Sequence, residues 1–313
     1  MDSRQLKHFR KIVEHGSMSA AARSLGIAQP SLSQLVRNLE ASLGVELLMR
    51  SARGVSATEA GDRLYNYACR IETLLEDARS EVINVGSRPA GRVTFGMPPS
   101  ISMALSIPMA ETLRVELPEI QFCATEGMSG HLREWVMSGE INLAILYDNT
   151  GLGDCMAEFL LTEELWVYSA PDLWPFKTPP GTPVDLRDVI AQDLVLPSRR
   201  HELRKFIDQA ARNERPEPIV TIEMDSLPQI LSLVARGSAY TVISPAAVFG
   251  MVQEGKLIGS PIRNPSLSRK LYLVRTAAAR ITAATRATET CCREVVGDLV
   301  TRGFWQAELP QTE

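Results

Sequence analysis

The side chains best suited to recognise another molecule lie on one face of a predicted helix near the N-terminus. From Pro30 onward, Leu32, Val36 and Leu39 recur at helical spacing and form an apolar face. The opposite face has no large apolar side chain and consists of Pro30, Ser33, Gln34 and Arg37. Hydroxyl, amide and guanidinium groups are those that pair with base edges and phosphates in the major groove of DNA. We therefore expect base-edge contacts from Gln29, Ser33, Gln34 and Arg37, with Pro30 and Ser31 packing at the helix start.

Positive charge concentrates around this helix. Residues 1–57 hold eight basic and four acidic side chains, whereas the whole chain holds 33 Lys and Arg against 37 Asp and Glu. A basic segment on an acidic body indicates that only the segment meets a polyanion. Residues 46–58 are typical of a β-wing, with two arginines around its turn. Four side chains are expected to anchor phosphates or the minor groove: Arg4, Arg50, Arg53 and Thr58.

Two shorter helices are predicted before the polar face. Apolar residues recur at helical spacing over 4–15, and an Ala-rich segment follows over 20–26. Gly16 and Gly26 end these helices, and two helices joined by such a tight turn form a helix-turn-helix. The polar face of a surface helix is usually just solvated. Here a three-helix unit, a basic wing and local positive charge coincide with that face, which favours DNA binding.

Residues 58–85 predict one long helix with a second interaction surface. Its apolar positions alternate in steps of four and three, a heptad pattern that favours pairing with another helix. The alternative is that the helix lies on its own second domain. Pairing of two copies would present two recognition helices to neighbouring half-sites. The expected dimer seam is Leu64, Ala68, Ile71, Leu75, Ala78 and Val82.

The remaining body, residues 91–303, alternates predicted strands and helices. This order favours parallel sheets covered by helices, and its length favours two subdomains. The chain is expected to cross between the subdomains near 161–163 and again near 267–270.

Hydroxyl groups follow the predicted strands of the body, where helix N-termini would point. Ligands bind at such strand ends in open α/β sheets, so a small anionic or polar effector is expected there. Serine is also a favoured helix cap, and capping remains the alternative for each residue. The candidates for effector binding are Ser100, Ser129, Ser198, Arg199 and Ser226.

The chain resembles the LysR-type transcriptional regulators. The resemblance is carried by residues 6–61, including the Ala-Ala-x-x-Leu turn, Gln29-Pro30-Ser31-x-Ser33 and Arg50-x-x-Arg53. Two positions depart from the family pattern: Leu48 stands where Phe is usual, and Ala28 where a Ser or Thr cap is frequent. In family members, positions that match Ser100, Ser129 and Ser198 often contact effector.

The resemblance implies a winged helix-turn-helix domain, mostly α, followed by a long linker helix. Beyond these it implies a periplasmic-binding-protein-like α/β effector domain of two Rossmann-like subdomains. It also implies a homodimer through the linker helix, usually assembled into a tetramer, which binds an interrupted palindrome in double-stranded DNA. RNA polymerase is a further candidate partner. The expected domains are 1–58 for DNA binding, 59–90 for linker and hinge, 91–303 for effector binding, and a tail at 304–313. Within the effector domain, 91–162 and 269–303 form one subdomain and 163–268 the other.

Other function classes lack their sequence signals. The chain has no G-x-x-x-x-G-K-[ST] or G-x-S-x-G motif, so we expect neither catalysis nor a cofactor. Four His and five Cys without a C-x-x-C pair give no reason to expect a metal site. No apolar segment suits a membrane span or secretory signal, so a cytoplasmic location is expected. The remaining alternatives are a regulator without a small-molecule effector and, on the body alone, a solute-binding protein.

Overall fold

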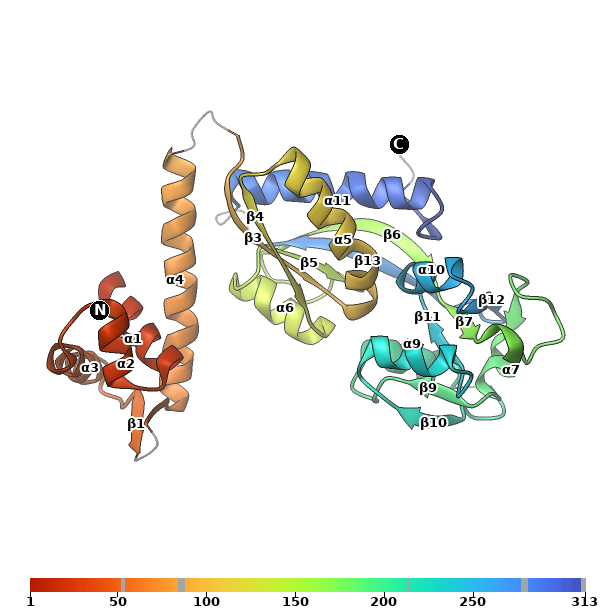
Figure 1. Cartoon of the computed structure of the whole chain (residues 1–313), viewed down its shortest axis with the longest axis horizontal. Coiled ribbons are helices and arrows are strands. Elements are labelled where there is room, and N and C mark those ends of the chain that lie inside the picture. Colours follow the sequence, from red (N-terminus) through yellow and green to blue (C-terminus); the bar gives the residue numbers. More distant parts are fainter. Residues whose placement is uncertain (52–53, 84–87, 213, 277–280, 311–313) are drawn as a thin grey trace. The chain divides into compact units, whose positions relative to one another are not determined.

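The computed structural model describes residues 1–51, 54–83, 88–212, 214–276 and 281–310. It divides the chain into two compact units, Met1–Gly86 and Ser87–Glu313 (Figure 1). We call them the N-terminal unit and the C-terminal unit. No helix in the described part of the chain has the length and apolar character needed to cross a membrane.

Three short helices form the core of the N-terminal unit: α1 (Ser3–His15), α2 (Met18–Leu25) and α3 (Gln29–Leu43). The first begins with a capping box, in which the Asp2 side chain accepts from the Gln5 N–H and the Gln5 side chain accepts from the Asp2 N–H. Each helix ends at a glycine with left-handed backbone, as the sequence predicted for the first two. Phe9, Ile12 and Leu32 are fully buried between the helices.

A two-stranded wing and a long helix complete this unit. Strands β1 (Leu48–Ser51) and β2 (Gly54–Ala57) pair antiparallel, and α4 (Glu59–Ile83) follows directly. The start of α4 packs closely against the wing, because a Cβ added at Gly61 would overlap the carbonyl oxygen of Leu47. That carbonyl also accepts from the Thr58 N–H at 3.0 Å, so it is held in place.

The larger sheet of the C-terminal unit has the strand order β14-β6-β13-β5-β3-β4. Its strands are β3 (Gly91–Met97), β4 (Ile120–Glu126), β5 (Leu143–Leu146), β6 (Met156–Glu164), β13 (Ser268–Arg275) and β14 (Ala307–Glu308). Helices α5 (Pro99–Glu116) and α11 (Ala283–Thr301) cover one face, and α6 (Ser129–Ser138) covers the other (Figure 1). The strand period confirms two covered faces. Leu143 and Ile145 join the core under α5 and α11, whereas Ala144 and Leu146 join the core under α6.

The expectation of purely parallel sheets is wrong. Strand β3 is parallel to β4 and β5, but β13 is antiparallel to β5 and β6. The cause is the crossing between subdomains: β6 carries the chain out and β13 carries it back, so the two must run in opposite directions. The crossings lie between β6 and β7, at Leu165, and between β12 and β13.

The second subdomain contains a four-stranded sheet of order β11-β7-β12-β8 and a parallel pair, β9 with β10. Its strands are β7 (Trp166–Ser169), β8 (Val184–Asp185), β9 (Leu194–Leu196), β10 (Val220–Glu223), β11 (Thr241–Ile243) and β12 (Ile258–Arg263). Its helices are the 3-10 turn η1 (Pro171–Leu173), α7 (Leu186–Ile190), α8 (Glu202–Ala210), α9 (Leu227–Ala235) and α10 (Pro245–Gln253).

The segment after α11 packs into the larger sheet instead of forming the expected tail. Trp305 is 1% exposed, and β14 pairs antiparallel with β6. The reason is that β6 would otherwise be an open sheet edge, and Trp305 finds both an apolar surface and a hydrogen-bond acceptor there.

Candidate functional site

The outward face of α3 carries side chains that are hydrogen-bonded to one another. Arg37 donates from Nη2 to Gln34 Oε1 at 2.6 Å, and Gln34 donates from Nε2 to Asn38 Oδ1 at 2.8 Å. All three side chains are exposed. A side chain that is already ordered loses less entropy on binding, so this face presents its guanidinium and amide groups at little cost.

The first turn of α3 adds three exposed residues, Gln29, Pro30 and Ser31. Ser19, near the start of α2, donates to Gln29 Oε1 at 3.2 Å and so links the two helices of the helix-turn-helix. Ala28 provides no side-chain cap, as its departure from the family pattern predicts. A recognition helix contacts bases mainly through such N-terminal residues.

Two predicted contact residues are poorly placed to contact DNA, one because it is buried and one because its hydroxyl is already bonded within the protein. Only 9% of Ser33 is exposed, so it is the least accessible of the four predicted base-edge residues. Thr58 donates from Oγ1 to the Glu46 carbonyl at 2.8 Å and accepts from the Gly61 N–H at 3.0 Å. Both bonds occupy the hydroxyl, so Thr58 caps α4 and its proton is not available to a phosphate.

The predicted basic anchors are only partly described. Arg4 is exposed on α1. The side chain of Arg50 and the whole of Arg53 lie outside the described residues, so their contacts with phosphate stay predictions.

The predicted dimer seam separates into two halves. Leu64 packs against the core of the N-terminal unit, and Ala68 is 2% exposed beneath α1. Farther along α4, Leu75 is 52% exposed and Val82 is 75% exposed, and Ala78 is exposed as well. The first half therefore fixes α4 to its own helices, and the second half has an apolar row that α1–α3 do not cover.

A groove of about 650 Å³ lies between α1, the end of α2 and the middle of α4. Its apolar floor includes Leu6, Ile71 and Leu75, and its rim is basic with one acid, Glu72. Glu72 pairs with Arg10 Nε at 3.0 Å, which ties α4 to α1 at this point.

In the C-terminal unit, Ser100 belongs to a buried polar network at the point where the chain crosses between subdomains. Arg269 donates from Nη2 to Ser100 Oγ at 3.3 Å and from Nε to Glu163 Oε1 at 2.7 Å. The Ser100 hydroxyl also lies 3.1 Å from the Tyr147 hydroxyl. The Arg269 guanidinium lies over the Tyr147 ring, 4.1 Å from its centre. Burial raises the pKa of Tyr147, so this hydroxyl stays protonated and can donate to Ser100.

Glu163 joins this network to two other elements. It is fully buried and accepts from the Ser244 hydroxyl at 2.6 Å and from Trp305 Nε1 at 2.8 Å. Ser244 precedes α10, and Trp305 follows α11. One carboxylate therefore fixes both crossing strands and the starts of two neighbouring segments.

Two helices begin after neighbouring strands at one end of the larger sheet. Strands β3 and β4 are parallel and in register up to Met97 and Glu126, and α5 and α6 begin shortly after. Neither helix has a side-chain cap. Ser100 and Ser129, both buried, stand in these first turns. Adjacent uncapped N-termini favour an anion.

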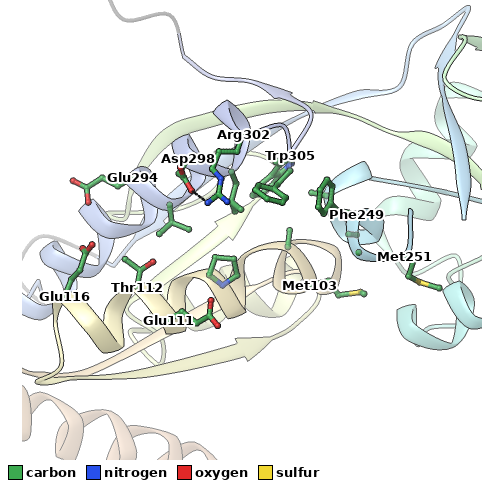
Figure 2. A pocket seen from close by; sticks show the side chains of 18 residues that line it. Met103, Glu111, Thr112, Glu116, Phe249, Met251, Glu294, Asp298, Arg302 and Trp305 are labelled. Carbon is green, nitrogen blue, oxygen red and sulfur yellow. Dashed lines mark hydrogen bonds and ion pairs between the residues drawn. The ribbon is translucent and has the colours of Figure 1, made fainter. Parts of the chain in front are cut away.

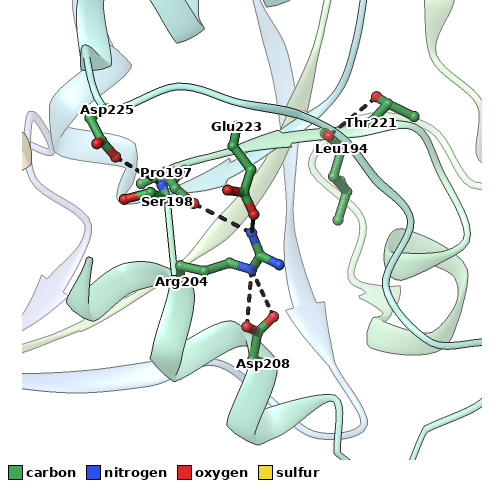
Figure 3. Close-up of polar contacts among 8 residues, drawn as sticks. All are labelled: Leu194, Pro197, Ser198, Arg204, Asp208, Thr221, Glu223 and Asp225. Carbon is green, nitrogen blue, oxygen red and sulfur yellow. Dashed lines mark hydrogen bonds and ion pairs between the residues drawn. The ribbon is translucent and has the colours of Figure 1, made fainter. Parts of the chain in front are cut away.

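The other predicted effector residues lie on the second subdomain. Ser198 donates from its backbone N–H to Asp225 Oδ1 at 2.8 Å, and bonds from Ser198 lower the pKa of Asp225 (Figure 3). Arg204 is buried beside them and pairs with Asp208 and Glu223. Arg199 and Ser226 are exposed. The Asp225 carboxylate thus already occupies one N–H group that an anionic effector would use.

A cavity of about 370 Å³ lies between the two subdomains, and none of the five predicted effector residues lines it. Its lining is Tyr147, Asp148, Asn149, Glu202, Phe206, Ser268, Arg269, Lys270 and Tyr272. Sequence reasoning missed Tyr147, Glu163 and Arg269. Glu163 and Arg269 both lie within the predicted crossings, near 161–163 and 267–270, and this was the available signal. No group of three His, Cys, Asp or Glu side chains among the described residues could hold a metal ion.

Comparison with known proteins gives two family matches. Residues 3–62 match the sequence model of the bacterial regulatory helix-turn-helix proteins of the lysR family. Residues 86–297 match that of the LysR substrate binding domain.

Individual relatives extend over nearly the whole chain. The nitrogen assimilation regulatory protein nac of Klebsiella aerogenes is 32% identical over 303 residues, covering 96% of each chain. The crystal structure of CbnR, a LysR family transcriptional regulator, has a TM-score of 0.71 at 19% identity and covers 95% of this chain and 99% of that one. Full-length CbnR in complex with its target DNA has a TM-score of 0.70 at 19% identity and covers 94% and 100%. At these identities the two structures show the shared fold.

Proposed function

Because the chain belongs to the LysR family of transcriptional regulators, we propose that α3 reads a specific DNA sequence under the control of a small effector bound in the C-terminal unit. The observation that carries this proposal is the exposed, hydrogen-bonded face of α3. Gln29, Gln34 and Arg37 are the base-reading residues, and Arg4 and the wing arginines anchor the backbone. Such a regulator acts where the DNA is, in the cytoplasm, and performs no catalysis.

Arg37→Ala is expected to relax sequence preference at one base pair of the site. A guanidinium that contacts a guanine in two places contributes about 1–3 kcal/mol of discrimination, or roughly 5- to 150-fold in relative affinity. The measurement is equilibrium binding to the preferred site and to each single-base variant of it, at fixed salt.

Arg63→Ala is the matched control, because it removes the same charge from an exposed ion pair with Glu59 on α4. It should leave the relative affinities for the variant sites unchanged. An Arg37→Ala protein that keeps the wild-type ranking of sites would show that α3 does not read bases through this residue.

The exposed end of α4 supports pairing of two copies, with the groove beside α1 open to the partner helix. Leu75→Asp with Val82→Asp is expected to halve the mass measured by light scattering and to weaken binding to a palindromic site at least tenfold. Tyr67→Asp, at an exposed position outside the seam, is the control. Two copies bound to DNA require an interrupted palindrome, and further assembly to a tetramer agrees with this arrangement. An unchanged mass in the double variant would contradict the proposal that two copies pair through this part of α4.

For the effector, the uncapped N-termini of α5 and α6 favour a small carboxylate near Ser100 and Ser129. Screening small carboxylates, aromatic acids and amino acids by thermal shift should find a ligand, because one present at 100 times its Kd adds about 2.7 kcal/mol of stability. Ser100→Val should weaken binding of that ligand about tenfold, because the ligand's carboxylate would lose the Ser100 hydroxyl as a hydrogen-bond donor. Ser232→Val, at an exposed position of α9 outside the five candidates, is the comparison. A hit that both variants bind equally would show that Ser100 only supports the fold, and a blank screen would favour a regulator without an effector.

A further inference from the structure

A second pocket, separate from the cavity between the two subdomains at Tyr147 and Arg269, lies between α5, α10 and α11. Its volume is about 740 Å³, within the range of roughly 300–1,000 Å³ that is usual for small-molecule sites. Phe249 and Trp305 face each other at one end of it, and Glu116 and Glu294 lie at the other (Figure 2).

One wall of this pocket is held rigidly. The Trp305 indole donates to the buried Glu163, and the same carboxylate accepts from Ser244 at the start of α10. Phe249 and Phe304 make an edge-to-face contact with their ring centroids 4.6 Å apart. An apolar surface with aromatic side chains is therefore already in place, which reduces the cost of binding.

The charged groups around this apolar surface are almost all acidic. The lining contains four carboxylates, Glu111, Glu116, Glu294 and Asp298, against one cation, Arg302. Asp298 is paired with Arg302 at 3.1 Å, whereas the three glutamates form no ion pair with any described residue. The pocket thus combines an apolar interior with a negative rim, the opposite of what an anionic effector needs.

Arg302 shows how a cation is held here. Its guanidinium lies 4.7 Å from the centre of the Phe304 ring and contacts the Asp298 carboxylate. An aromatic face on one side and a carboxylate on the other is the usual surrounding of a bound organic cation. The three remaining glutamates offer the same partner to a second cation whose apolar part enters the pocket.

We propose that this pocket binds a small organic cation with an apolar body, such as an aryl-alkyl ammonium ion. The apolar part packs among Phe249, Leu299 and Trp305, and the ammonium group faces Glu111 and Glu294 at the rim. Its negative rim distinguishes this pocket from the effector site proposed near Ser100 and Ser129, which favours anions.

Phenethylammonium is the probe, and 3-phenylpropionate, with a similar ring and chain but opposite charge, is its control. We expect saturable binding of the ammonium ion to the full chain at low millimolar concentration by calorimetry or ligand-observed NMR, weakening as salt is raised. The carboxylate should bind at least tenfold more weakly at this pocket. Glu111→Gln with Glu294→Gln should weaken phenethylammonium about five- to tenfold, because both charges are exposed.

A filled pocket provides the sharper test. Gly250 lines the pocket on α10, and a Cβ added there meets no atom within 4 Å, so Gly250→Leu places a side chain in the open space. Gly297→Leu is matched to it, since Gly297 is also helical, has equally free surroundings and does not line the pocket. Leucine is the better helix former, so both variants should fold.

Gly250→Leu is expected to abolish phenethylammonium binding, whereas Gly297→Leu and Ser100→Val retain it. The proposal is overturned if phenethylammonium does not saturate below about 20 mM, if the carboxylate binds as well, or if the two leucine variants behave alike. It is equally overturned if no amine binds and Gly250→Leu instead changes the oligomer size, because a second copy of the chain would then be the occupant.

Discussion

Arg269→Met is expected to destabilise the C-terminal unit by about 3–5 kcal/mol, the usual cost of removing one partner from a buried ion pair. Glu163 is fully buried, and without Arg269 its charge faces only the Ser244 hydroxyl and the Trp305 indole. Desolvation of the guanidinium opposes its charge, but Tyr147 and Glu163 outweigh this and raise the pKa of Arg269. Arg269 therefore keeps its charge, and urea unfolding followed by circular dichroism measures the loss of stability.

A second substitution separates charge from shape. Adding Glu163→Gln to Arg269→Met removes the unpaired charge but keeps an oxygen that accepts from Trp305, so the double variant should be more stable than Arg269→Met alone. Arg63→Met, in an exposed ion pair with Glu59, is the control and should change stability by less than about 0.5 kcal/mol. A double variant less stable than Arg269→Met would mean that burial of the charge is not what the pair compensates.

Gly61→Ala is expected to destabilise the N-terminal unit by roughly 3 kcal/mol, at the upper end of what overpacking costs. The added methyl group would overlap the Leu47 carbonyl oxygen, and that oxygen accepts from the Thr58 N–H and cannot move away without losing this bond. The wing and α4 would have to separate, so DNA binding should fall together with stability. Thermal unfolding and binding to the preferred site are the two measurements.

The same substitution in open surroundings provides the contrast. Gly297→Ala lies in α11 with no atom within 4 Å of the new Cβ, and it should raise stability by about 0.5–1 kcal/mol through helix propensity. A Gly61→Ala protein that unfolds at the wild-type temperature would show that the wing and α4 are not packed as closely as described.

Local patterns predicted the elements of the N-terminal unit well. The apolar spacing of residues 4–15 and the Gly16 stop correspond to α1, and residues 30–39 lie within α3, because these helices bury one face and cap themselves within a few residues. The same reasoning did not foresee that Ser33 is only 9% exposed or that the Thr58 hydroxyl caps α4. A hydroxyl has the same appearance in a sequence whether it meets a phosphate, caps a helix or faces a core.

Contacts between distant segments set the limit in the C-terminal unit. The antiparallel pairing of β6 with β13 joins residues more than a hundred positions apart, and no local periodicity encodes it. The segment 304–308 is short and ends in a charged residue, so its sequence does not predict a strand. It packs against the larger sheet because the edge of β6 would otherwise be open. The positions of Ser100 and Ser129 in first helical turns could be predicted, because helix starts after strands are visible in sequence, whereas the pairing of Arg269 with Glu163 depends on a contact between distant segments.

The packing of α4 against α1–α3 has a mechanical consequence. The pair between Arg10 and Glu72 and the burial of Ala68 make α1–α3 and the first half of α4 one stiff body. A helix of 25 residues is about 37 Å long. If α4 tilts by about 5° about its C-terminal end, the recognition helix α3 at the other end moves by about 3 Å. That distance is close to the rise of one base pair. A small rotation between two paired α4 helices would therefore change the spacing of half-sites that two α3 helices can contact at once. The change would be about one base-pair step.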